Sequence, residues 1–378
     1  MKDVYITRIS KFLPNNPISN DEMEGILGQI NGKPSRAKRV VLRNNGIKQR
    51  YYAINSQGKI THSNAELTQE AIAKLFDDSF TENSMELLCC GTSSPDQLLP
   101  SHAAMVHGLL ANKNMEINSA AGICCAGMSS LKFGFLSVKS GNSNNAVCTG
   151  SERSSTRIQA NMFNEEAVSL SSLEEQPIVA FKKEFLRWML SDGAGAMLLE
   201  NKKNETGISL KIDWMEAYSY AHELETCMYS GGEKLDDGSI KPWTEYNSKQ
   251  WLEESIFSVK QDVKILEKHI IDKGVESLEL VLKKHDKDSA DIDYFLPHLS
   301  SNFFAEKLKN KIKERGLQIP ESSWFTNLDR VGNVGSASIY LMLEELMYSG
   351  RLKKGDKIML SVPESGRFSY AYAHLTVH

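Results

Sequence analysis

Residues 120–128 read A-A-G-I-C-C-A-G-M, with two cysteines set among small residues. A short apolar run at 115–118 comes before this stretch, and Cys125–Ser140, with apolar residues at helical spacing, follows it. Small residues let a strand and the helix that follows it pack closely. The stretch therefore predicts a strand–helix junction inside an α/β protein.

Strand-like runs and helical segments alternate on both sides of this junction. Short apolar runs predict strands at 85–90, 145–148, 194–199, 294–296 and 357–362. Helical spacing covers 101–110, 261–284, 303–315 and 336–347. This alternation predicts α/β layering with buried, mostly parallel strands.

A polar stretch at 200–206 separates two halves of similar style. We expect an N-terminal half, residues 1–203, that carries the two cysteines, and a C-terminal half, residues 204–378. Two further polar regions, 165–175 and 230–250, lack periodicity and are expected to be loops that shape a pocket.

Composition excludes several classes of protein. The chain has 44 Lys+Arg against 48 Asp+Glu, a net charge of −4, which argues against a nucleic-acid-binding surface. Hydrophobic residues make up 41% of the chain, enough for a sizeable core. No apolar run approaches the ~18 residues of a membrane span, and the N-terminus lacks the apolar core of a signal peptide. We expect a soluble cytoplasmic protein that binds neither nucleic acid nor membrane.

The six cysteines do not suggest a disulfide framework or a metal site. Two adjacent pairs, Cys89-Cys90 and Cys124-Cys125, lack the C-x-x-C spacing of zinc and redox sites. A thiol at a helix N-terminus is expected to have a lowered pKa, which suits an acyl-accepting nucleophile. Small residues around a cysteine are as often close packing, so the local sequence leaves both interpretations open.

Two segments of the C-terminal half offer partners for such a thiol. His298 follows a predicted strand in L-P-H, and Asn333 lies in the glycine-framed turn 332–338, G-N-V-G-S-A-S. A lone histidine after a strand is more often a surface or core residue, and such a turn is an ordinary helix start. Together, in the chain order Cys, His, Asn, these three residues favour a catalytic site over three unrelated structural features.

Six blocks in sequence carry a resemblance to a known family. They are R-x-x-G-I-x-x-R at 43–50, G-T-S-S-P-D with P-S at 91–101, C-A-G at 125–127, S-D-G-A-G-A at 191–196, P-H at 297–298 and G-N-x-G-S-A-S at 332–338. The chain resembles the β-ketoacyl-acyl-carrier-protein synthase III group of thiolase-superfamily condensing enzymes over nearly its whole length. The resemblance implies an α/β fold of five αβαβα layers built from two similar halves.

The resemblance also implies residue roles. Cys125, rather than Cys124, would take the acyl group, because it directly precedes Ala-Gly. His298 and Asn333 would hydrogen-bond the carbonyl of the second thioester and stabilise its enolate. Gly366 would supply a backbone N–H that joins that of Cys125 in an oxyanion hole.

The resemblance further implies acyl-carrier-protein or coenzyme A thioesters as substrates, no cofactor and no metal. It implies a homodimer in which Leu99 reaches the partner subunit's acyl pocket, where a side chain smaller than the common aromatic leaves room for a longer or branched acyl group.

Departures from the family pattern refine this expectation. Val40 replaces the tryptophan that stacks on the adenine of coenzyme A, which favours a carrier-protein donor. The basic segment 33–43 is then either a solvated face or a dock for phosphate or an acidic carrier protein. The tail 363–377 and the extended N-terminal basic segment look closer to the ketosynthase-cyclases of bacterial dialkylresorcinol and stilbene pathways. Those enzymes use a β-ketoacyl thioester and couple condensation to ring closure.

Several alternatives remain. A fatty-acid-type initiation synthase that decarboxylates malonyl thioester would use the same three residues. Retention of Asn333 favours carbanion chemistry over an acyltransferase or thioesterase on the same fold in which His298 would activate an alcohol or water. Retention of Cys125 argues against a non-catalytic subunit. A thiolase would need a second catalytic cysteine, and Cys227 lacks a glycine-rich frame.

Overall fold

The computed structural model describes residues 1–35, 37–111, 113–163 and 186–378. Within these ranges a nine-stranded sheet runs in the order β13-β14-β15-β8-β1-β7-β6-β4-β5. Its strands are β1 (Tyr5–Phe12), β4 (Leu87–Thr92), β5 (Glu116–Ala121), β6 (Asn145–Glu152), β7 (Gly193–Glu200), β8 (Leu210–Ser219), β13 (Tyr294–Pro297), β14 (Lys357–Glu364) and β15 (Ser369–Val377).

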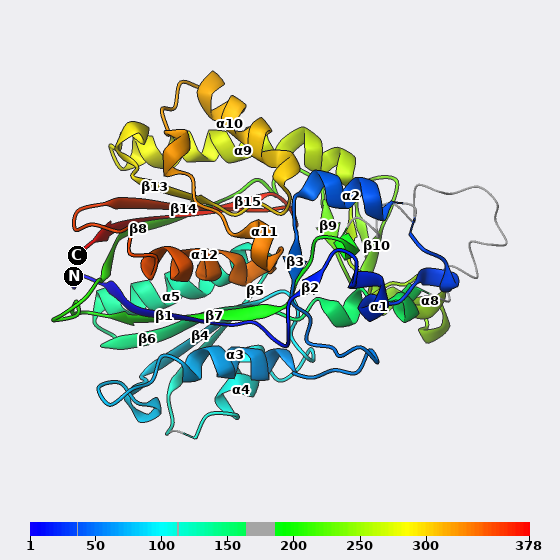
Figure 1. Cartoon of the computed structure of the whole chain (residues 1–378), viewed down its shortest axis with the longest axis horizontal. Coiled ribbons are helices and arrows are strands. Elements are labelled where there is room, and N and C mark those ends of the chain that lie inside the picture. Colours follow the sequence, from blue (N-terminus) through cyan, green and yellow to red (C-terminus); the bar gives the residue numbers. More distant parts are fainter. Residues whose placement is uncertain (36, 112, 164–185) are drawn as a thin grey trace.

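Helices cover and divide this sheet to give five layers (Figure 1). The inner layer is α5 (Cys125–Ser140) and α12 (Ser338–Met347), which contact strands of both halves. The outer layers are α9 (Val263–Lys284) with α10 (Ala305–Glu314) on one side and α3 (Asn64–Ala73) with α4 (His102–His107) on the other. The predicted fold class is confirmed.

The prediction of mostly parallel strands is wrong. Only the pairs β4–β5, β4–β6 and β13–β14 are parallel within the described sheet, and the other ladders are antiparallel. Helical layers on both faces bury antiparallel and parallel strands alike. An apolar run therefore predicts a buried strand but not whether that strand is parallel to its neighbours.

Each half of the chain contributes its own part of the sheet. β1 joins β8 through a short ladder at Tyr5 and Ile6, and the expected boundary at 203/204 falls between β7 and β8. That boundary stays a prediction.

Short elements form one end of the molecule, opposite the two chain termini (Figure 1). They are α1 (Met23–Leu27), α2 (Lys38–Asn45), β2 (Ile18–Ser19), β3 (Gln49–Arg50), β9 (Met228–Tyr229), β10 (Gly232–Lys234), β11 (Ile240–Pro242), α8 (Ser248–Glu253) and β12 (Lys260–Gln261). The region 230–250, expected to be a loop, therefore contains short strands and the start of a helix. The expected loop at 165–175 lies outside the described residues.

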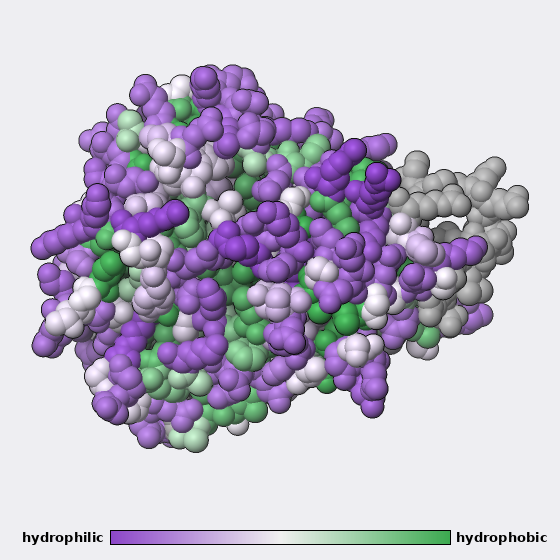
Figure 2. All heavy atoms as spheres, viewed as in Figure 1, coloured by the Kyte–Doolittle hydropathy of each residue, from purple (hydrophilic) through white to green (hydrophobic). Residues whose placement is uncertain are grey.

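The face drawn in Figure 2 is mainly hydrophilic, with apolar residues in strips near its centre. No helix in the described part of the chain is long and apolar enough to cross a membrane. A short α11 (Leu328–Val331) leads into the glycine-framed turn before α12.

Candidate active site

A cavity of about 390 Å³ contains two of the three predicted catalytic residues. His298 and Asn333 line it from the C-terminal half, and Cys124 and Glu152 line it from the N-terminal half. Apolar residues make up much of the remaining wall, among them Leu186, Met189, Leu190, Met228, Ile270 and Leu278. An apolar cavity with a few convergent polar groups is typical of a small-molecule site.

His298 is held at the end of β13. Its backbone N–H donates to the carbonyl oxygen of Ser361 on β14 (2.8 Å), and its side chain is only 3% exposed. Burial lowers the pKa of His298 to about 4, so the imidazole is neutral at neutral pH. Its Nε2 atom has no hydrogen-bond partner among the described residues. A neutral imidazole carries one N–H donor and one acceptor, which suits hydrogen bonding to a substrate carbonyl.

Asn333 is held by hydrogen bonds of its backbone and of its side-chain oxygen. Its N–H donates to the carbonyl of Met189 (3.0 Å), and its own carbonyl accepts from the N–H of Ser191 (2.8 Å). Its Oδ1 accepts from the N–H of Gly335 (3.0 Å), so Nδ2 is the side-chain donor that remains for a ligand.

The adjacent cysteines line different cavities. Cys124 lines the large cavity, whereas Cys125 lines a second cavity of about 290 Å³, and Gly122 and Tyr370 belong to both walls. The Cys125 thiol points to the carbonyl oxygen of Val362 (3.3 Å). The structure therefore brings His298 and Asn333 together with Cys124 and sets Cys125 on the neighbouring wall.

The expected lowering of the thiol pKa is not found. Cys125 is the first residue of α5, yet burial raises the pKa of its thiol, and the negative charge of Glu364 raises it further. Loss of solvation outweighs the positive end of the helix dipole.

Glu152 is a buried acid that the sequence interpretation missed. Its carboxylate accepts from the N–H and Oγ of Ser93 (3.0 and 2.7 Å), from Oγ of Ser94 (2.6 Å) and from the N–H of Ser336 (3.3 Å). It thereby ties the loop after β4 to the turn that carries Asn333. An acidic residue at the end of an apolar strand is the sequence signal that could have predicted Glu152 as a site residue.

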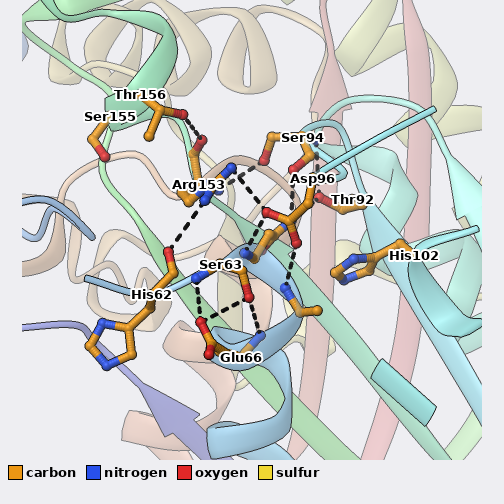
Figure 3. A network of polar contacts seen from close by, with 12 residues as sticks. His62, Ser63, Glu66, Thr92, Ser94, Asp96, His102, Arg153, Ser155 and Thr156 are labelled. Atoms are coloured by element: carbon orange, nitrogen blue, oxygen red, sulfur yellow. Dashed lines mark hydrogen bonds and ion pairs between the residues drawn. The ribbon is translucent and has the colours of Figure 1, made fainter. Parts of the chain in front are cut away.

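A polar network fixes the same loop from the other side (Figure 3). Asp96 accepts from the N–H groups of Asn64 (2.9 Å) and Ala65 (3.0 Å) at the start of α3, and it forms an ion pair with Arg153 (3.0 Å). The Arg153 N–H donates to Ser94 Oγ (2.8 Å). The loop carrying the Glu152 partners is thus anchored to α3.

The remaining predicted residues lie apart from His298 and Asn333. Gly366 lies beside the Glu364 side chain, and its carbonyl accepts from the N–H of Cys227 (2.9 Å). Leu99 is 84% exposed, and Val40 on α2 is also exposed. The roles predicted for these residues stay predictions. Within the described ranges, no group of three or more His, Cys, Asp or Glu side chains is arranged to hold a metal ion.

Comparisons with known proteins agree with this fold. The family described as 3-oxoacyl-[acyl-carrier-protein (ACP)] synthase III C terminal matches residues 282–372, which include His298 and Asn333. The β-ketoacyl-[acyl-carrier-protein] synthase III of Rickettsia prowazekii is 26% identical over 355 residues, 94% of each chain.

Solved structures support the same fold. The tetronic acid condensing enzyme AbyA1 has a TM-score of 0.76 at 20% identity and covers 99% of both chains. Xanthomonas campestris OleA, solved with lauric acid and lauroyl-CoA, has a TM-score of 0.72 at 18% identity and also covers 99% of both chains. The family match and the sequence relatives, together with the fold, identify a condensing enzyme of the acyltransferase class. Within that class, the chain is similar to β-ketoacyl-[acyl-carrier-protein] synthase III enzymes.

Proposed function

We propose that this enzyme holds an acyl group on Cys125 as a thioester and condenses it with a second, β-ketoacyl thioester, with closure of a ring. One observation carries the proposal: the cavity with His298 and Asn333 and the cavity of Cys125 are neighbours that share the wall residues Gly122 and Tyr370. The acyl chain would occupy the smaller cavity, and the second thioester the larger one.

The chemistry follows from these positions. A β-ketoacyl substrate loses a proton from the carbon between its two carbonyls, and His298 and Asn333 hydrogen-bond the resulting enolate. That carbon forms a bond to the acyl carbon, the C–S bond to Cys125 breaks, and the thiolate leaves. When the acyl group is α,β-unsaturated, the carbon on the other side of the substrate's ketone loses a proton and adds to the β-carbon of the acyl group, whose α-carbon takes up a proton. The six-membered ring that closes is a cyclohexanedione, the precursor of a dialkylresorcinol.

We infer an acyl-carrier-protein donor. Val40 is exposed on α2, where the basic residues Lys38, Arg39 and Arg43 also lie, and a basic helix suits an acidic carrier. The name of the Rickettsia relative includes acyl carrier protein, which supports this donor. Arg36 of the same basic segment lies outside the described residues.

A second candidate is a decarboxylating synthase that uses malonyl thioester to start a fatty-acid or polyketide chain. The similarity to the Rickettsia β-ketoacyl-[acyl-carrier-protein] synthase III over 94% of both chains favours it. The same three residues serve both reactions, so the substrates must separate them.

The test is product mass spectrometry with acyl thioesters offered in pairs. An unsaturated acyl thioester with a β-ketoacyl thioester should give a cyclic product that retains both carbon skeletons. A linear product longer by one acetate unit, formed only with malonyl thioester, would establish the second candidate instead.

We also infer a homodimer. β5 is the edge of the described sheet, and its Ile117 is exposed, as are Leu98 and Leu99 in the segment after β4. A second copy that pairs with this edge would cover both the unpaired backbone groups and these side chains.

A further inference from the structure

Glu364 places a carboxylate on the backbone of the proposed nucleophile. Its Oε2 accepts from the N–H of Ile123 (2.9 Å) and from the N–H of Cys125 (2.9 Å), at the start of the 16-residue helix α5. The carboxylate therefore occupies the positive end of that helix, where an anion is stabilised.

Two glycines flank this side chain. A Cβ atom on Gly122 would lie 3.4 Å from Glu364 Oε2, and one on Gly366 would lie 3.4 Å from Oε1. Gly122 has a φ of 159°, and its neighbour Ile123 donates one of the two hydrogen bonds. The Glu364 side chain thus lies between the backbone at Gly122–Ile123 and Gly366, the residue predicted to complete the oxyanion hole.

This position conflicts with an acylated thiol. The carbonyl oxygen of an acyl group on Cys125 gains negative charge when it is attacked, and the Cys125 N–H is the nearest donor that can stabilise it. An N–H group aimed at a carboxylate is not available to an oxyanion, and the two negative charges repel each other.

We propose that Glu364 is a positioning residue that occupies the oxyanion site of the resting enzyme and leaves the Cys125 N–H when an acyl thioester binds. This inference rests on the proposed function. In the resting state the carboxylate adds to the effect of burial in keeping the thiol protonated, and so protects the nucleophile from reaction without substrate.

Other ionisable groups face the same position. The charge of Glu152 on β6 acts on Glu364, and Cys124 lies next to the nucleophile. Tyr370 from β15, Glu216 from β8 and Lys132 from α5 line the cavity of Cys125. A test must therefore isolate the charge of Glu364 from the charges of these neighbours.

The experiment measures alkylation of Cys125 by iodoacetamide between pH 6 and 10, without substrate. All proteins carry Cys124→Ala, so that the tryptic peptide 114–132 contains one cysteine. Glu364→Gln keeps an oxygen acceptor but removes the charge, and Glu364→Ala removes both. Glu279→Gln, at a half-buried glutamate of α9 paired with Arg315, is the control. Thermal unfolding verifies that each variant is folded.

Loss of the charge in Glu364→Gln should raise the alkylation rate at pH 7 about tenfold and move the pH profile about one unit lower. Glu364→Ala should behave similarly, and Glu279→Gln should match the parent. If Glu364→Gln matches the parent and only Glu364→Ala differs, the side chain is a structural support and the inference is wrong. Because no acyl substrate is used, this outcome is distinct from failure of the proposed function, which would appear as an acyl adduct on Cys125→Ala.

Discussion

The carbonyl group of Ser336 occupies the space that a Cβ atom on Gly127 would need. Gly127 belongs to α5 of the N-terminal half, and Ser336 follows Asn333 in the C-terminal half. The hydroxyl of Ser336 also donates to the carbonyls of Gly91 (3.2 Å) and Ser151 (3.0 Å). The two halves therefore meet backbone to backbone next to Cys125 in one half and Asn333 in the other.

Gly127→Ala should destabilise the protein. The new methyl group would press on backbone that cannot move aside, and overpacking of this kind costs about 2 kcal/mol. Gly25→Ala is the matched control, because a Cβ at that position in α1 meets nothing within 4 Å. Denaturant unfolding should show a lower midpoint for Gly127→Ala and an equal or higher one for Gly25→Ala. Equal midpoints for Gly127→Ala and the wild type would contradict the close contact.

Cys125→Ala should abolish both the acyl adduct and the product, while Cys124→Ala should remain acylated. The reason is that Cys125 begins α5 and directly precedes Ala-Gly, whereas Cys124 is its N-cap residue. Intact-protein mass after incubation with acyl thioesters measures the adduct. An adduct that survives in Cys125→Ala and disappears in Cys124→Ala would transfer the role to the cysteine that lines the large cavity with His298.

His298→Ala and Asn333→Ala should separate the two half-reactions. Both side chains line the larger cavity, proposed here for the second thioester. Acylation should therefore persist while condensation falls by about 10²–10³, the typical cost of one oxyanion donor. Single-turnover acylation and product formation are measured on the same samples. Equal losses in both steps would argue that these residues act on the first thioester.

Stability should fall as the pH drops from about 6.5 to 4. Burial lowers the pKa of His298 to about 4, so the unfolded chain binds more protons in this range and unfolding is favoured. The shift from 6.5 corresponds to about 3 kcal/mol. His298→Gln should lose less stability over this range than the wild type, and His222→Gln, at an exposed histidine, is the control. Parallel pH curves for His298→Gln and the wild type would refute the assignment. His102, whose pKa burial also lowers to about 4, adds to the wild-type slope.

Leu99→Trp should block long acyl groups without preventing acylation by short ones, if two copies share their pockets. The exposed position of Leu99 is consistent with contact across an interface. Sedimentation velocity measures the assembly, and adduct mass measures the acyl length accepted. A stable and fully active monomer would contradict the shared pocket.

The sequence predicted local elements well and their assembly only in part. The helix Cys125–Ser140 has the predicted bounds, because small residues precede it and Gly141 ends it in the left-handed conformation. β1, β8 and β15 were not predicted, although the β1–β8 ladder joins the two halves and β15 connects β8 to β14. Their residues alternate or mix polarity, and their pairing is set by partners far away in the chain.

The candidate site divides in the same way. His298 and Asn333 were found through their motifs, and the structure brings them into one cavity. Glu364 carried no signal, because its contacts with Ile123 and Cys125 depend on β14 reaching the start of α5. Cys124 and Cys125 line different cavities because their side chains point in different directions. The sequence does not predict these directions.

The exposed edge of β5 has a consequence for handling the protein. An unpaired strand edge flanked by apolar side chains is a template for uncontrolled strand addition and aggregation. Substitutions that separate two copies at this edge would therefore lower solubility as well as change the oligomeric state. Ile117 is exposed on this strand, so Ile117→Lys should limit that precipitation when a monomeric form is wanted.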